Sequence, residues 1–394
     1  MRGYSFTIKF VIAGALLFAL LSFNWDRTEL EGRAFVVAIG IDASQEEGER
    51  FEVSMSIADV AAMEGEGGDA DVAVLRVACG ESAARAMGQV DAQISDKVYY
   101  GHTKAIVLGE SILSDEALLR EVIDTLSRKN EINIKCIVMA TDKAAKDVLE
   151  AKPREQNLLG VYLSGFYNSN NANAAAAVVK LDLEGLTESL RSTGSAVIPK
   201  ITLEEEDDKG EDESQPEIII SGVAVLRDFT LADYVPNEDM AGFLWIMADA
   251  AGSQVAVDAG GGHITFLVHK SKATLDFDSN GPGGRAHCRV KLRAEGAIEG
   301  ARFMEDYLYD TETMRQLQNR FADKIHDEIY DILRIFQQDL GVDGFGLKER
   351  LRKKNRRLHE RCLDEAHGDW QAAFENMAFA VDADVIIRNT GPVK

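Results

Sequence analysis

The sequence is poor in proline, cysteine and basic residues, and each shortage excludes something. Only 6 of its 394 residues are proline, which argues against long proline-rich linkers and favours folded globular domains. Lys and Arg number 43 against 66 Asp and Glu, so the formal net charge is −23. Because a chain of that charge repels phosphate backbones, we expect no nucleic-acid partner.

The few cysteines form no metal-binding motif. They lie far apart in the chain, without a C-x-x-C or any other zinc-ligand spacing. We therefore predict buried or free thiols. The alternative is a disulfide between two cysteines that are distant in the chain. The four positions are Cys79, Cys136, Cys288 and Cys362.

The sequence also lacks the usual signatures of catalysis. It contains no G-x-S-x-G elbow, no H-E-x-x-H, no Walker loop and no strand-borne G-x-G-x-x-G. Only His287 stands next to a cysteine, Cys288, and neighbours on a strand point to opposite faces, so we expect no dyad. We therefore predict a non-enzymatic protein with no catalytic, cofactor-binding or metal-binding residues and no cofactor.

An uncharged hydrophobic run stands near the N-terminus. Basic residues precede the run Phe10–Phe23 and acidic residues follow it, which is the layout of a secretory signal or membrane anchor. Its fourteen residues suit a signal core better than a full span, whereas eighteen are available from Phe6 if Lys9 snorkels. We predict a signal-like leader or anchor over residues 1–24. The alternative is a buried N-terminal helix.

The rest of the chain alternates between strand-like and helix-like segments, which predicts an α+β fold. Short apolar runs such as Phe35–Ile41 and Ala105–Leu108 predict strands, and helical spacing predicts a helix over Ala117–Arg128. Near the C-terminus, an apolar stripe over residues 314–336 predicts a long helix. The alternation in Phe379–Arg388 predicts a strand with one covered face.

Shifts in composition predict three mixed α/β domains after the leader. The segment Leu203–Glu217 carries nine acidic residues and one lysine, so it cannot bury itself and we expect an exposed linker there. The predicted units are the leader 1–24, an N-terminal α/β domain 25–202, the acidic linker 203–217, a β-rich middle domain 218–286 and a C-terminal α/β domain with the long helix 287–394.

One stretch runs against the overall acidity. Residues 348–361 contain eight Lys or Arg against two acids. Apolar residues at helical spacing within and beside this stretch predict an amphipathic helix, so the alternative is an ordinary solvated helix face. A local positive patch attracts counter-charges even on an acidic protein, so we predict a surface for anionic lipid or an acidic partner. Its residues are Arg352, Lys353, Arg356 and Arg357.

Four blocks in the chain, taken in order, point to a family. Directly after the hydrophobic run stands Trp25-Asp26-Arg27-Thr28-Glu29-Leu30, followed by Gly40-Ile41-Asp42. Residues 101–110 read GHTKAIVLGE. The third block joins 222–226 with 242–246, and the fourth joins Asp343-Gly344-Phe345-Gly346, Trp370, Phe374 and 381–388. In this order the blocks resemble the C-subunit family of bacterial spore germinant receptors, the GerC-type proteins, over nearly the whole chain.

The resemblance implies a membrane-associated, non-enzymatic subunit of a germinant receptor that supports receptor assembly and nutrient-triggered spore germination. It implies two integral-membrane partners, a transporter-like subunit and a second membrane subunit. It also implies a location at the membrane surface, on the extracytoplasmic face of the spore inner membrane. The alternative from another class is an exported solute-binding or hydrolytic protein tethered to the membrane, which needs a cleft with converging polar groups.

The chain departs from the family at the lipidation position. GerC-type proteins usually carry a lipobox that ends in cysteine just before the W-D-R segment, whereas this chain has Asn24 there. Asparagine has no thiol to accept a diacylglycerol, and Phe23 is too bulky for the small residue expected before a cleavage point. We therefore predict no lipidation and a leader that stays attached as the anchor.

Intact-mass measurement tests the uncleaved leader. For protein extracted from its native membrane, we expect the mass of the chain with its leader and without acyl groups. A mature N-terminus at or near Asn24, or a mass that includes acyl chains, would contradict this prediction.

Overall fold

The computed structural model describes residues 32–58, 73–151, 153, 158–168, 179–204, 216–259, 262–301 and 311–389. The predicted leader, Asn24 and most of the acidic linker lie outside these ranges. Within them, no helix is both long enough and apolar enough to cross a membrane. Helices and strands occur throughout, which confirms the α+β class.

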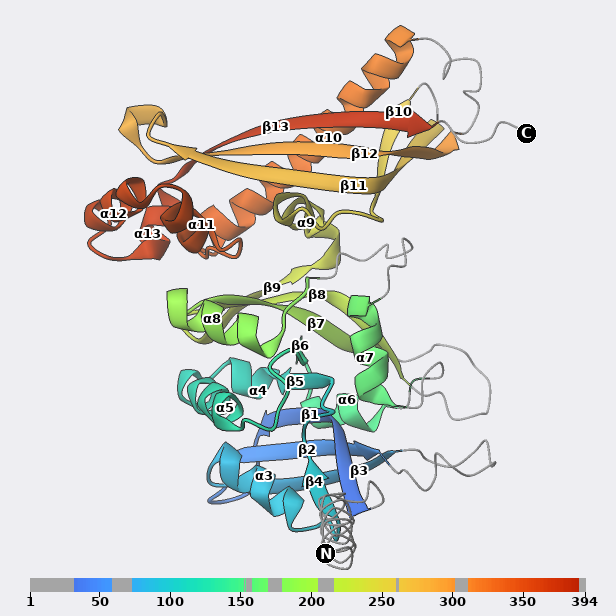
Figure 1. Ribbon diagram of the computed structural model, residues 1–394, viewed down its shortest axis with the longest axis vertical. Coiled ribbons are helices and arrows are strands. Elements are labelled where there is room, and N and C mark those ends of the chain that lie inside the picture. Colours follow the sequence, from blue (N-terminus) through green and yellow to red (C-terminus); the bar gives the residue numbers. More distant parts are fainter. Residues whose placement is uncertain are drawn as a thin grey trace, which may run out of the picture.

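The strands of the larger of the two sheets lie one above another along the long axis of the molecule (Figure 1). Its strand order is β3-β2-β1-β5-β6-β7-β8-β9, with β4 paired to the start of β1. The β1-β5-β6-β7 centre is parallel, and β4 also pairs parallel with β1. The remaining pairs, β1-β2, β2-β3, β7-β8 and β8-β9, are antiparallel. The strands are β1 (Arg33–Ala43), β2 (Phe51–Ala58), β3 (Ala73–Gly80), β4 (Lys97–Tyr99), β5 (Ala105–Gly109), β6 (Ile137–Thr141), β7 (Ala196–Glu204), β8 (Glu217–Arg227) and β9 (Thr230–Pro236).

Helices cover both faces of this sheet, which explains why its central strands are buried (Figure 1). One face packs against α3 (Ala83–Asp91), α4 (Glu110–Leu113), α5 (Glu116–Arg128) and α8 (Leu183–Thr193). The other face packs against α6 (Ala145–Glu150) and α7 (Leu159–Asn168). The strands predicted in 35–41 and 105–108 and the helix predicted in 117–128 are confirmed.

The smaller sheet has the order β10-β11-β12-β13 and packs against a long helix, α10. Its strands are β10 (Gln254–Ala259), β11 (Gly262–Asp278), β12 (His287–Ala301) and β13 (Ala378–Asn389). The helices are α9 (Ala241–Met247), α10 (Thr311–Arg334) with a π-helical continuation (Ile335–Asp339), α11 (Leu347–Lys354), α12 (Arg356–Glu365) and α13 (Trp370–Glu375). The predicted long helix and the closing strand are confirmed.

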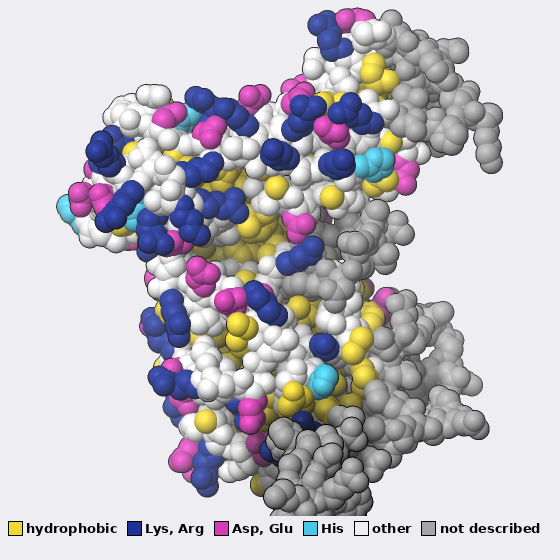
Figure 2. Space-filling model, in the orientation of Figure 1, with side chains coloured by type: hydrophobic (Ala, Val, Ile, Leu, Met, Phe, Trp, Pro, Cys, Tyr) yellow, Lys and Arg dark blue, Asp and Glu magenta, His cyan; other side chains and the backbone are white. Residues whose placement is uncertain are grey.

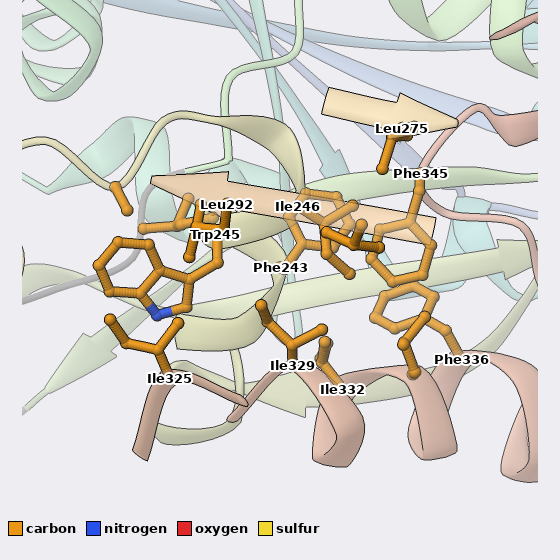
Figure 3. Close-up of a cluster of buried hydrophobic side chains, with 14 of the residues drawn as sticks. Phe243, Trp245, Ile246, Leu275, Leu292, Ile325, Ile329, Ile332, Phe336 and Phe345 are labelled. Carbon is orange, nitrogen blue, oxygen red and sulfur yellow. The ribbon is translucent and has the colours of Figure 1, made fainter. Parts of the chain in front are cut away.

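One hydrophobic core joins the two sheets. Val197 and Val223 from the larger sheet belong to the same buried cluster as the aromatic residues that surround α9 and α10. Figure 3 shows Phe243, Phe336 and Phe345 together, and each pair of their ring centroids is 5.2–5.7 Å apart. The sheets are therefore held together by apolar contacts rather than by a flexible connection.

The strand pairing cuts across the predicted domain boundaries. β7 and β8 pair antiparallel up to Glu204 and Glu217, so the segment 203–217 connects neighbouring strands of one sheet. The predicted middle domain 218–286 is divided, because β8 and β9 belong to the larger sheet and β10 and β11 to the smaller. The amino-acid composition of a segment predicts that the segment is exposed. It does not predict which strands pair at the two ends of the segment.

Candidate partner-binding surface

A buried carboxylate, that of Asp343, precedes the basic segment 348–361 and holds its first turn in place. Asp343 Oδ1 accepts hydrogen bonds from the backbone N–H groups of Phe345 and Leu347, at 3.2 and 2.9 Å. Its Oδ2 accepts from the N–H of Lys348 at 2.9 Å and from the indole Nε1–H of Trp370 at 2.8 Å. Burial raises the pKa of Asp343, and these donors act against the rise. This carboxylate fixes the start of α11 and links it to α13.

The segment predicted as one amphipathic helix is two helices, α11 and α12, which are separated at Asn355. The Asn355 side chain accepts a hydrogen bond from the N–H of Leu358 at 3.1 Å and so caps α12. Asparagine competes for backbone hydrogen bonds in this way, which explains the break. The predicted apolar face is confirmed, because Leu351, Leu358 and Cys362 are all buried.

The four predicted surface cations are all exposed, but they differ in their ion pairs. Arg352 pairs with Glu349 at 2.6 Å, and Arg356 pairs with Glu360 at 2.8 Å, both within their own helices. Lys353 and Arg357 have no ion-pair partner in the part of the chain that the structure describes. These two cations are therefore the ones whose charge is available to a partner.

An open groove of about 710 Å³ lies beside this segment, where α5, α8, α11 and the loop before β6 meet. Arg352 lines it, whereas Lys353, Arg356 and Arg357 do not. Ile134 in that loop is 53 % exposed, which is unusual for a large apolar side chain. The other lining residues are Ser127, Leu183, Glu184, Thr187, Glu188, Arg191, Ser192, Lys348 and Glu349.

The charges along the groove balance. Three cations, Arg191, Lys348 and Arg352, face three glutamates on the same walls. Figure 2 shows Lys and Arg side chains gathered on the left of the upper body, where Figure 1 places α11 and α12. A groove with both charges and an exposed isoleucine suits a protein segment with mixed side chains better than a simple anion.

Two of the sequence blocks meet in the larger sheet for a structural reason. Asp42 accepts hydrogen bonds from the N–H groups of Ala145 and Lys146, at 2.8 and 3.0 Å, and so fixes the start of α6. A Cβ at Gly109 would collide with this carboxylate, which explains the glycine there. Burial raises the pKa of Asp42, while the two backbone donors oppose the rise. The signal in the sequence was the resemblance alone, because no local pattern links residues 42 and 145.

The reactive side chains do not converge. His287 Nδ1 lies 3.3 Å from Asp278 Oδ1, whereas Cys288 points into the core, where burial raises its pKa to about 12. The two therefore lie on opposite faces of β12, as predicted. All four cysteines are unpaired, which confirms the prediction of buried or free thiols. The described ranges contain no group of three or more His, Cys, Asp or Glu placed to hold a metal ion.

Comparison with known proteins gives a consistent result. Residues 26–203 match the family described as Spore germination protein N-terminal domain, and residues 221–391 match Spore germination B3/GerAC like, C-terminal. Two relatives from Bacillus subtilis (strain 168) are each 22 % identical to the chain. Spore germination protein KC aligns over 93 % of this chain and 92 % of its own length. Putative spore germination protein YfkR aligns over 88 % and 85 %.

A solved structure shares the fold. The crystal structure of the GerBC protein matches with a TM-score of 0.57 and 16 % identity, and the match covers 90 % of this chain and 98 % of that one. The two family regions together span most of the sequence, in the order expected from the four blocks. The chain therefore belongs to the GerC-type family of spore germination proteins.

Proposed function

We propose that this protein is the C subunit of a spore germinant receptor, tethered to the extracytoplasmic face of the spore inner membrane. In this role it supports receptor assembly and nutrient-triggered germination by binding, not by catalysis. The observation that carries the proposal is the pair of spore germination regions, 26–203 and 221–391, in one chain. The predicted leader supports the tether, and the predicted partners are a transporter-like subunit and a second membrane subunit.

The surface of α11 and α12 supports a binding role. Lys353 and Arg357 offer exposed cations, and the groove beside Arg352 offers Ile134 with charges of both signs. Confinement at a membrane raises the effective concentration of the chain near its partners, so a modest contact area is enough to hold a complex. We assign this surface, Ile134 together with Arg352, Lys353 and Arg357, to contact with another receptor subunit.

Co-purification tests the assignment. The tagged full-length chain, extracted from spore inner membranes in mild detergent, is expected to bring down both other receptor subunits in near-equal amounts. Spores that lack the chain are expected to lose the response to their nutrient. Recovery of the chain alone, together with normal germination of the deletion strain, would contradict the proposal and favour a separate exported protein.

A further inference from the structure

An exposed aromatic cluster lies at the start of the larger sheet. The rings of Phe35, Tyr99 and His102 form a triangle with centroid distances of 5.2–5.8 Å. The His102 side chain is exposed, and those of Phe35 and Tyr99 are half-buried. The guanidinium of Arg33 lies 5.2 Å from the Tyr99 ring centroid. We call Phe35, Tyr99 and His102 the N-terminal aromatic cluster.

Strand pairing brings this cluster together. β1 and β4 run parallel, with Phe35 opposite Tyr99 and Arg33 opposite Lys97, so the two rings share a face. The Tyr99 ring folds over Gly101, where a Cβ would be 2.5 Å from the tyrosine oxygen. Gly101 therefore lets the chain turn under the ring and present His102 beside it. The cluster thus gives a local reason for the first residues of the GHTKAIVLGE block.

The charges around the cluster are positive, although the whole chain is acidic. The two segments that form it, residues 33–35 and 96–104, contain three cations and one acid. The cations are Arg33, Lys97 and Lys104, and the acid is the exposed Asp96. Aromatic rings flanked by cations are typical of protein surfaces that rest at the level of lipid headgroups.

The position of the cluster in the chain indicates what it contacts. Arg33 comes ten residues after Phe23, the end of the hydrophobic run, so an extended connection spans at most about 35 Å. In Figure 1, β4 lies at the lower end of the molecule, and the smaller sheet lies at the opposite end. This end of the fold is therefore the one that an anchored chain holds within reach of a bilayer.

We propose that the N-terminal aromatic cluster, together with Lys97 and Lys104, rests on the anionic phospholipid surface and orients the protein with its smaller sheet away from the bilayer. This inference rests on the membrane tether in the proposed function. The rings lie among the headgroups, and the cations face lipid phosphates.

Tryptophan fluorescence in vesicles tests the contact. The full-length chain carries Trp25→Phe, which leaves Trp245 and Trp370, both buried, as a constant background. Tyr99→Trp then reports on the cluster. The matched control is Tyr330→Trp on α10, because Tyr330 is 38 % exposed and also lies against a histidine, His326, at 4.6 Å. Vesicles contain phosphatidylglycerol, phosphatidylcholine and a lipid with a spin label on its headgroup.

We expect quenching at position 99 to exceed that at position 330 by about threefold or more, and to fall when Lys97→Glu and Lys104→Glu are added. Equal quenching at the two positions would overturn the orientation. Quenching at 99 that is unchanged in vesicles of phosphatidylcholine alone would overturn the role of anionic lipid. Flotation of the same samples distinguishes a failure of the orientation from a failure of the membrane tether. A chain that does not float with the vesicles is not tethered, whereas a chain that floats but shows equal quenching at the two positions is tethered in another orientation.

Discussion

Asp343→Ala is expected to lower the free energy of unfolding by about 4 kcal/mol. The substitution removes the two carboxylate oxygens that accept hydrogen bonds from four buried or partly buried donors. These donors are three backbone N–H groups at the start of α11 and the Trp370 indole N–H. Each donor left without an acceptor keeps its desolvation cost without its hydrogen bond. Chemical unfolding of the full-length chain in detergent, followed by far-ultraviolet circular dichroism, measures the change.

Three further variants separate the hydrogen bonds from other causes. Asp343→Asn keeps the shape but turns one oxygen into a donor, so we expect about half the loss. Trp370→Phe removes the indole donor together with part of a buried ring, so it should cost about 2 kcal/mol, and only the hydrogen-bond share of that cost should disappear when Asp343→Ala is already present. Asp339→Ala, at an exposed position four residues away, should stay within about 0.5 kcal/mol of the parent. A loss below about 1 kcal/mol for Asp343→Ala would contradict the structural role.

The same network fixes the junction between the two sheets. The N–H of Asp343 donates to Gln371 Oε1 at 3.0 Å, and Gln371 Nε2 donates to Ser195 Oγ at 2.8 Å, just before β7. Loss of Asp343 is therefore expected to loosen the groove between α8 and α11 as well as α11 itself. The buried hydrogen bonds from Asp343 through Gln371 to Ser195 thus help to hold the helices that form the walls of the groove.

Lys353→Glu combined with Arg357→Glu is expected to reduce recovery of the other receptor subunits about tenfold, because the reversed charges repel an acidic partner surface. Both side chains are exposed and lack an ion-pair partner in the described ranges, so the fold should be unaffected. Reversal of all four cations is a weaker design, since it also breaks the pairs of Arg352 with Glu349 and of Arg356 with Glu360. Quantitative co-purification from spore membranes gives the result.

A matched double variant controls for net charge. Lys143→Glu with Lys272→Glu reverses two exposed lysines at other places, Lys143 just after β6 and Lys272 on β11, and should leave recovery unchanged. Ile134→Glu tests the groove separately, because this exposed side chain contributes little to the core. If the double reversal of Lys353 and Arg357 leaves both recovery and germination at the parental level in a folded protein, the segment is only a solvated helix face. Partner contact would then lie elsewhere.

Local patterns in the sequence determined much of the fold. The burial of Leu351, Leu358 and Cys362 follows from helical spacing, and the strand at 379–388 follows from alternation. These features depend on which face of a single element is apolar, and a short window of sequence contains that information. The order of the four blocks likewise sufficed to identify the family.

The tertiary structure alone decided how the elements combine. Asp42 meets Ala145 across 103 residues, and Gln371 meets Ser195 across 176. The groove collects Ile134, Glu184 and Lys348 from three separate segments, and β8 joins the larger sheet although a run of acids precedes it. Such contacts depend on strand order and on the packing of a shared core, and neither is encoded in the spacing of neighbouring residues.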